Sequence, residues 1–298
     1  MFKNVIVYRI GAGWSAQPAQ MEAALEPARF VACAASQEQS AGWVEPRGEA
    51  HGALVESVGG QLLLKFMTEA KVLPGSVVNR KAQEQVAQIE ASTGRKPGRK
   101  EVREIREELR QTLLPMAFTR QARMNVWIDP AASLALIDAA SQARADEVAT
   151  ALVKSLEGLS LTLLNTKTSP AAAMSEWLTS QEPPAGFSVD RECELKAADE
   201  SKSAVRYANH ALDIEEVRQH IEAGKLPTRL ALTWEGRVSL LLTESLQIKK
   251  IAFLEGVFDG TSQEREDGFD ADAAIATGEL RKLVPDLLLA LGGEVVPG

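Results

Sequence analysis

The sequence predicts an α+β protein whose mixed sheet domains are interrupted by an inserted helical hairpin. The chain has 298 residues, 45% of them apolar and 25% charged, which is typical of a globular protein with more than one core. Segments of strand-like alternation are interspersed with segments of helical period, and two consecutive helical patterns fall within 71–123. We therefore expect a central α+β domain (1–70 plus 124–170), a helical tip (71–123) and an α+β base domain (171–298).

The first seventy residues read as strands around one helix and then a hairpin. The clearest local signal is Gly59-Gly60, because a two-residue glycine turn between alternating apolar segments favours a tight hairpin. In order, we expect a strand at 4–10, an amphipathic helix at 18–27, a strand at 29–35, a loop at 42–46 and a hairpin of 53–58 with 61–67.

After Leu73-Pro74-Gly75 the apolar period changes from two to about 3.6 residues. This change predicts helices at 77–91 and 99–114. A cluster of glycine and proline at 92–98 separates them, since neither residue type suits a helix interior. The tip should therefore be a pair of helices joined by a short turn.

Strand-like alternation returns after the tip, and a second α+β unit follows a segment rich in proline and glycine. We expect Asp213 to cap the helix that ends before Gly224-Lys225. The expected elements are strands at 124–129 and 134–138, a helix at 141–156, a domain boundary at 157–184, strands near 186–196, 202–208, 228–234, 237–243 and 248–253, and helices at 213–223 and about 271–291.

The net charge of −8 argues against a generic polyanion binder, because Lys and Arg supply most non-specific affinity for DNA. The charges are, however, unevenly distributed. From Lys71 to Arg123 there are twelve Lys or Arg and six Asp or Glu, whereas 254–298 holds ten acids and three bases. A chain with signs separated in this way can still present a basic surface to a phosphate backbone.

The second tip helix carries Arg99, Arg103, Arg106 and Arg110 at spacings of four, three and four. At about 100° per residue these side chains form one narrow stripe, which is suited to tracking phosphates. The same pattern is also typical of a solvated helix laced by pairs such as Arg103 with Glu107.

The strongest enzyme signal is the run Gly11-Ala12-Gly13 directly after an apolar strand, which fits a loose dinucleotide-binding pattern. Trp14 follows the second glycine, Pro18 delays the helix, and no acid ends the next strand. A simple turn therefore explains the two glycines better. A nucleotide-dependent oxidoreductase using Gly11 and Gly13 is the alternative from another functional class.

No catalytic residue, cofactor or metal is predicted. Cys33 and Cys193 lie far apart in apolar contexts and are expected to be buried free thiols. The acids at 264–272 lack the spacing of a calcium loop and favour a helix start. The N-terminus reads as a strand without a cleavage site, and no apolar run has the length of a membrane span, so we expect a cytoplasmic protein with no membrane partner.

Most aromatic residues are expected to be structural. Trp43, Trp127, Trp177 and Trp234 adjoin apolar stretches and are typical of core anchors. Phe118 differs, because it follows the basic helical pair, where an exposed aromatic ring could serve a subunit contact.

Many short motifs together resemble the recombination-associated RdgC family over nearly all of the 298 residues. Their order and spacing carry the resemblance rather than any single motif. They are Phe2-Lys3-Asn4 with Tyr8-Arg9, Gly42-Trp43-Val44 with Pro46, Leu73-Pro74, Leu114-Pro115 with Ala117-Phe118 and Arg120, Trp127-Ile128-Asp129, Glu176-Trp177, Gly186-Phe187, His220-Ile221-Glu222-Ala223-Gly224-Lys225, Leu230-Ala231-Leu232 with Trp234 and Arg237, Phe269-Asp270-Ala271-Asp272, and Thr277-Gly278-Glu279-Leu280.

The resemblance implies a horseshoe-shaped subunit that closes through two contacts into a ring-shaped homodimer around double-stranded DNA. It further implies a non-catalytic, nucleoid-associated role that limits access of the RecA recombinase, with Phe118 at the contact between tips. One departure weakens the base domain's expected share of DNA contact. At 208–211 this chain has Ala-Asn-His-Ala where many relatives carry lysines, which leaves Arg206 nearby.

The sequence therefore predicts non-specific, electrostatic binding of double-stranded DNA. A third possibility is an interaction module that binds the recombinase itself. The candidate DNA contacts are Arg99, Arg103, Arg106, Arg110, Arg120, Arg123, Arg206, Lys225 and Arg229.

Overall fold

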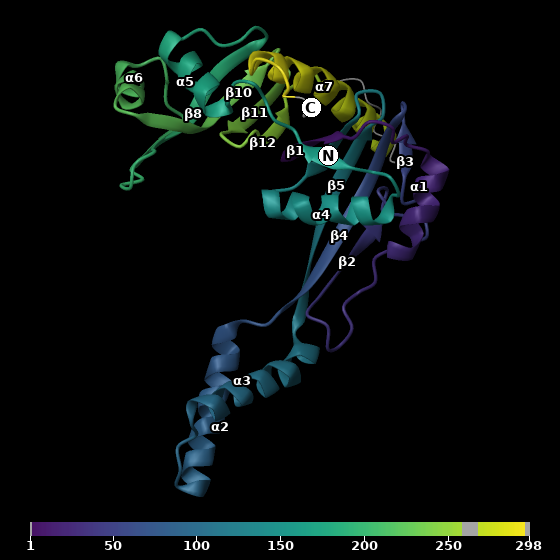
Figure 1. Cartoon of the computed structure of the whole chain (residues 1–298), viewed down its shortest axis with the longest axis vertical. Coiled ribbons are helices and arrows are strands. Elements are labelled where there is room, and N and C mark those ends of the chain that lie inside the picture. The colour runs from purple at the N-terminus through teal and green to yellow at the C-terminus, as the bar shows by residue number, and fades with distance from the viewer. Residues whose placement is uncertain (1, 258–267, 296–298) are drawn as a thin grey trace.

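The computed structural model describes residues 2–257 and 268–295, and within them the chain is α+β, as predicted. Twelve strands form one large sheet (Figure 1). Its order is β2-β4-β5-β6-β1-β12-β11-β10-β8-β9, with β3 beside β4 and β7 beside β1. Every pair of named strands is antiparallel. The strands of the N-terminal and C-terminal parts of the chain therefore share one continuous sheet.

Seven α-helices accompany the sheet in the described part of the chain. The strands are β1 (Val5–Ile10), β2 (Gln39–Val44), β3 (Glu56–Val58), β4 (Gln61–Val72), β5 (Phe118–Asp129), β6 (Leu134–Asp138), β7 (Leu161–Leu163), β8 (Phe187–Ala197), β9 (Ala204–Ala208), β10 (Lys225–Trp234), β11 (Val238–Thr243) and β12 (Ile248–Phe253). The helices are α1 (Pro18–Leu25), α2 (Gly75–Thr93), α3 (Arg99–Leu113), α4 (Gln142–Ser155), α5 (Pro170–Ser180), α6 (Glu215–Glu222) and α7 (Gly268–Ala290).

Two hydrophobic cores lie on opposite faces of the sheet. Because strand side chains alternate, β1 directs Val5 and Val7 into one core and Ile6 and Tyr8 into the other. The first core, on what we call the α7 face, is closed by α5, α6 and α7. The second, on the α4 face, is closed by α1 and α4. From β12 to β9 the α4 face has no helix over it (Figure 1).

The tip helices stand on a long two-stranded ribbon. Strands β4 and β5 pair continuously from Leu62 with Ile128 to Val72 with Phe118, and α2 and α3 follow at the far end (Figure 1). Both helices match the prediction, but both strands extend further into the tip than expected. The sequence did not reveal this extension because β5 is exposed on both faces up to Arg123, so it lacks the apolar alternation of a packed strand.

The strand predicted at 29–35 was wrong, as was the loop predicted at 42–46. Only Arg29 of the first segment forms a bridge, with Trp43, and Gly42 lies inside β2. A Cβ atom at Gly42 would lie 2.6 Å from the Phe30 Cα atom, so this glycine permits close backbone packing and marks no turn. The Arg29 side chain anchors the start of this segment through polar contacts.

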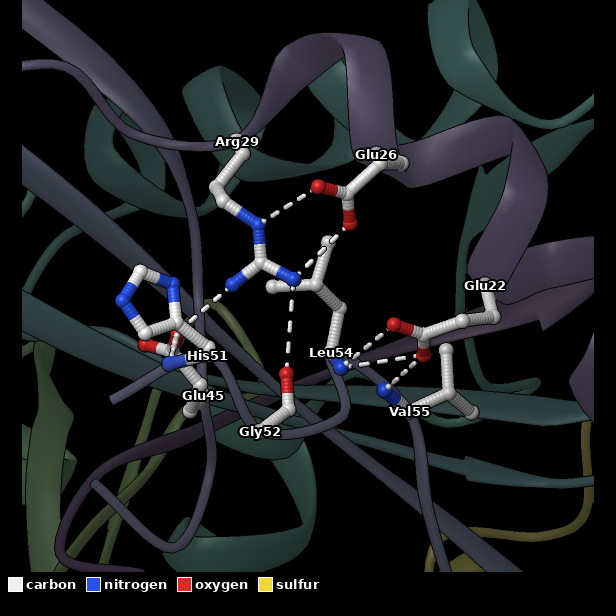
Figure 2. Close-up of polar contacts among 8 residues, drawn as sticks. All are labelled: Glu22, Glu26, Arg29, Glu45, His51, Gly52, Leu54 and Val55. Atoms are coloured by element: carbon white, nitrogen blue, oxygen red, sulfur yellow. Dashed lines mark hydrogen bonds and ion pairs between the residues drawn. The ribbon is translucent and has the colours of Figure 1, made fainter. Parts of the chain in front are cut away.

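Figure 2 shows these polar contacts, which connect α1 to the loop before β3. The Arg29 guanidinium donates to Glu26 Oε1 at 2.9 Å and to Glu45 Oε1 at 2.6 Å. The Glu22 carboxylate accepts the backbone N–H groups of Leu54 and Val55, each at 2.9 Å. Side-chain hydrogen bonds thus satisfy backbone groups here that a regular strand would otherwise pair.

The proline-rich segment 157–184, predicted to hold the domain boundary, includes regular structure. It contains α5, which begins at Pro170 and buries Met174 and Trp177 in the core of the α7 face. Proline suits the first turn of a helix, so here it marks a start. The predicted cap was wrong, because Ile214 and not Asp213 occupies the N-cap position of α6.

The turn at Gly11 and Gly13 lacks the setting of a dinucleotide site. Strand β1 pairs antiparallel with all its neighbours, whereas that site belongs to a parallel β-α-β unit. The Gly11 N–H donates to the Ser160 carbonyl at 3.0 Å, and a Cβ atom at Gly11 would lie 2.0 Å from Ser160 Oγ. Gly11 therefore allows the close approach of the segment before β7.

Candidate nucleic-acid interface

The four arginines predicted to form a stripe do lie together along α3, and all four are exposed. Ile105 on the adjacent face is buried against α2. The predicted pair of Arg103 with Glu107 does not form. In the described ranges, Arg99, Arg103 and Arg106 have no carboxylate within 4.0 Å, while Arg110 pairs with Glu38 at 2.8 Å.

A groove of about 840 Å³ lies between the ribbon of β4 and β5 and the start of α4. Its lining includes four cationic side chains, and three acids lie among them. Arg120 is exposed and has no ion-pair partner in the described residues, whereas Arg144 pairs with Glu147 at 2.9 Å. The cations are Lys3, Arg120, Arg123 and Arg144, and the acids are Glu69, Asp138 and Glu147.

Local contacts set the charge of this groove. Burial raises the pKa of Asp138. The hydrogen bonds that its carboxylate accepts from the backbone N–H groups of Asn4 and Lys3 lower this pKa, but burial has the larger effect. The side-chain amide of Gln121 donates to Glu69 at 2.8 Å and lowers the pKa of that carboxyl. Glu69 is therefore held as an anion beside the cations.

Arg120 and Arg123 both border the groove, although three residues apart on β5 their side chains leave opposite faces of the strand. Arg123 shares its face with Lys65, as the register of β4 and β5 requires. Burial, and then the charge of Arg123, lower the pKa of Lys65. The two arginines predicted as neighbouring contacts are thus not equivalent.

The three predicted contacts of the base region lie on β9 and β10, and two of them flank one carboxylate. Arg206 donates from Nε to Glu194 Oε2 at 2.5 Å, and Arg229 is the register partner of Glu194 across β8 and β10. Lys225 is half-buried, with Nζ 3.3 Å from His220 Nδ1. Arg229 is exposed, and its side chain, unlike those of the other two, makes no hydrogen bond within the described ranges.

Lysines of β12, which the sequence did not single out, lie between the base region and the groove. Lys249 Nζ donates to the carbonyl of Ala140, a groove residue, at 3.1 Å. Lys250 Nζ donates to Glu192 Oε1 at 2.6 Å. Cations thus follow the α4 face from β9 across β12 to Lys3 and the start of α4.

An exposed apolar group lies where the ribbon meets the tip helices. Phe118 is 87% exposed and pairs in register with Val72, which is 48% exposed, and the neighbouring Met116 is 70% exposed. Such a cluster is larger than the isolated apolar side chains common on protein surfaces. In contrast, Trp43, Trp127, Trp177 and Trp234 are buried, as predicted.

Residues 2–257 and 268–295 contain no group of three or more His, Cys, Asp or Glu placed to hold a metal ion. Glu264, Glu266 and Asp267 of the acidic cluster lie outside the described residues, and Asp270 pairs with Arg47 at 2.5 Å. None of the described helices combines the length and apolar character needed to cross a membrane.

Only one of the two thiols is buried as predicted. Cys193 is buried, and desolvation raises its pKa to about 12, whereas Cys33 is partly exposed beside Glu69. The prediction for Cys33 was wrong because its segment forms no strand that would cover it.

Comparison with known proteins identifies one family over the whole described chain. The model described as "Putative exonuclease, RdgC" matches residues 1–294. A protein of Dechloromonas aromatica (strain RCB) named recombination-associated protein RdgC is 44% identical over 301 residues, which cover 99% of this chain and 98% of that one. Proteins of the same name from Janthinobacterium sp. (strain Marseille) and Cupriavidus necator are 45% and 46% identical, over 99% and 98% of this chain and 98% of each relative.

Proposed function

The chain belongs to the RdgC family, and from that premise we propose that it is a non-specific double-stranded DNA-binding protein that acts in recombination without catalysis. The observation that carries the proposal is the set of exposed arginines without acidic partners, Arg99, Arg103 and Arg106 on α3 and Arg120 at the groove. Guanidinium groups that are free of protein carboxylates can bind phosphates at full strength.

The arrangement supports contact with the phosphate backbone of the duplex. The α3 stripe runs from Arg99 to Arg110, or about 16 Å of helix, which is long enough to follow several phosphates. Arg110 connects α3 to Glu38, next to the groove residues Gln37 and Gln39. The stripe and the groove therefore form one interface of tip and ribbon.

We further propose that the subunit is horseshoe-shaped and closes into a ring-shaped homodimer around the duplex. The apolar group at Phe118 would supply the contact between tips, and the base region (171–298) a second contact, with 1–70 plus 124–170 between them. Closure retains DNA topologically, so the net charge of −8 is compatible with stable binding. A ring on duplex DNA would restrain the RecA recombinase by occupying its substrate, and would place the protein at the nucleoid.

The proposal is tested by gel shift on linear and closed-circular duplex DNA over a salt series. Counterion release predicts that log affinity falls by about 0.9 per decade of salt for each phosphate neutralised. We expect a steep slope that does not depend on sequence, and complexes that survive high salt on closed circles only. Absence of duplex binding at low salt would refute the DNA-binding function, and binding of recombinase without DNA would then point to an interaction module.

The description of the family model names an exonuclease, so the non-catalytic part needs its own test. We expect end-labelled linear duplex to keep its length during prolonged incubation with the protein and Mg²⁺ or Mn²⁺. Shortening that scales with protein concentration and stops with a chelator would contradict this expectation and establish a metal-dependent nuclease.

A further inference from the structure

Strand β8 carries carboxylates in the middle of the base region's cations. Glu192 and Glu194 both project on the α4 face, because Cys193 and Leu195 between and beside them are buried in the opposite core. Glu194 faces Arg206 across β9 and Arg229 across β10. The acids thus lie among the residues that would otherwise meet phosphates.

The Glu194 carboxylate is held in place by hydrogen bonds from two neighbours, Thr228 and Arg206. Its side chain is 13% exposed, while that of Arg206 is 74% exposed. Oε1 accepts the Thr228 hydroxyl at 2.9 Å, and Oε2 accepts Arg206 Nε at 2.5 Å. Burial alone would raise the pKa of Glu194, but the hydrogen bonds from Thr228 and Arg206 and the charge of Arg229 outweigh it and lower the pKa. Glu194 therefore remains a carboxylate with its charge directed at the arginines.

Glu192, two residues before Glu194 on β8, is also bonded to a cation. Lys250 Nζ donates to both of its oxygens, at 2.6 and 2.8 Å. Both side chains are accessible to solvent, 42% for Glu192 and 61% for Lys250. Glu192 and Glu194 are thus each paired with a cation of a different strand, and Arg229 lies opposite Glu194 on the same open face.

We propose that Glu192 and Glu194 are internal counterions that weaken the binding of the base region to DNA, because they pair with Lys250 and Arg206 in place of phosphates and offset the charge of the nearby Arg229. This role rests on the proposed function and adds to it a regulator of affinity within the same interface. A cation neutralised by a protein carboxylate releases no condensed counterion when DNA arrives. The base region then contributes shape and closure with little electrostatic attraction, which suits a ring that must move along DNA.

The test compares the unchanged chain with E194Q and with E192Q/E194Q in fluorescence anisotropy on a linear duplex over a salt series. Glutamine keeps the acceptor for the Thr228 hydroxyl while removing the charge. We expect the double variant to steepen the salt slope by about 0.9 to 1.8, and to bind roughly tenfold or more tightly at 0.1 M salt, because one or two further phosphates are neutralised. E194Q alone should produce about half of the change in slope.

E176Q is the matched control, because Glu176 is an exposed acid on α5, which packs on the α7 face. It makes the same change in net charge as E194Q, half that of E192Q/E194Q, away from the interface and should leave the slope unchanged. An E192Q/E194Q slope equal to that of E176Q, in a protein with an unchanged melting temperature, would overturn the counterion role. If the double variant does not fold, R206Q in the E194Q background serves instead, and its failure to reverse the gain of E194Q would also overturn the role.

The outcomes separate this role from the proposed function. If the unchanged chain binds duplex DNA and the variants have no effect, the proposed DNA-binding function stands and only the counterion role is overturned. Binding by the double variant alone would support the counterions and show that the unchanged chain is held inactive. Absence of binding by every protein at low salt would overturn both.

Discussion

Helix α3 and the strands β8 to β12 are both rich in cations, but their cations have different partners. On α3, Arg99, Arg103 and Arg106 are free of carboxylates in the described ranges. On the strands, Arg206 is bonded to Glu194, and Lys250 to Glu192. Glu194 and Arg206 are register partners on neighbouring strands, where opposite residues lie about 5 Å apart, whereas Lys250 on β12 reaches Glu192 across β10 and β11. We infer that the presence or absence of a carboxylate partner, more than the number of basic residues, decides where phosphate can bind.

The two regions also differ in how they are supported. The only buried side chains of α2 and α3 are Ala82 and Ile105, whereas the strands of the base region lie on a core that includes Trp234 and Leu283. Exposed substitutions on the tip should therefore leave the free energy of unfolding nearly unchanged. The charge of the tip can therefore be altered without unfolding the protein, so its contribution to DNA binding can be compared with that of the base region.

The largest effect should come from removing the free arginines of α3. R99Q/R103Q/R106Q is expected to flatten the salt slope by up to about 2.7, and to weaken duplex binding at 0.1 M salt by roughly two orders of magnitude or more. Anisotropy titrations over a salt series measure both. The control is R80Q/K81Q on α2, where both cations contact Glu84. Equal losses per charge removed in the two proteins would show that net charge, not partnering, sets the affinity.

The next effect concerns self-association at the end of the ribbon. F118A should weaken the homodimer by about thirtyfold or more, as truncation of a buried aromatic hot spot costs about 2 kcal/mol or more. Sedimentation equilibrium measures the loss, and complexes on closed circles should no longer survive high salt. M116A, at a residue that is 70% exposed nearby, provides a milder comparison. An unchanged dimer with F118A would place the contact elsewhere.

The groove lining includes Arg120, which has no ion-pair partner in the described residues, and Arg144, which pairs with Glu147. Free and paired arginines can therefore be compared within one groove. R120Q should weaken binding about fivefold to tenfold at 0.1 M salt and flatten the slope by about 0.9. R144Q should have a smaller effect, because Arg144 already pairs with Glu147. Both changes remove one positive charge from the lining of the same groove. A larger effect of R144Q would contradict the role assigned to partners.

The sequence predicted the elements whose signal is local. The two tip helices follow from a change of apolar period, and the hairpin of β3 and β4 from Gly59-Gly60. It failed where a residue serves a distant contact. Gly42 suggested a loop, but it lies within β2 and admits the backbone of Phe30.

The candidate interface divides in the same way. The α3 stripe was predictable because its four arginines share one helix face. The lysines at 249 and 250 were missed because their position beside the groove depends on the pairing of β12 with β1, nearly the whole chain away in sequence. The role of Glu194 was hidden for the same reason, since only the register of β8 with β9 brings it to Arg206.

The smallest effect is expected from Arg206 itself. R206Q should change duplex affinity less than twofold at pH 7, because its charge is already balanced by Glu194. The pKa of Glu194 is lowered, so this carboxylate stays ionised down to pH values below the usual glutamate range near 4.3. Its stabilising pair with Arg206 is present above that range and is lost as pH falls through the lowered pKa.

The effect of R206Q should accordingly remain small from pH 8 to pH 5, which anisotropy titrations at fixed salt can follow. In the E194Q background the same substitution should weaken binding about fivefold to tenfold, because Arg206 is then free to meet a phosphate. A tenfold loss with R206Q alone at pH 7 would show that a paired arginine contacts DNA as strongly as a free one. The contrast between α3 and the strands would then reflect position along the duplex and not the partners of the cations.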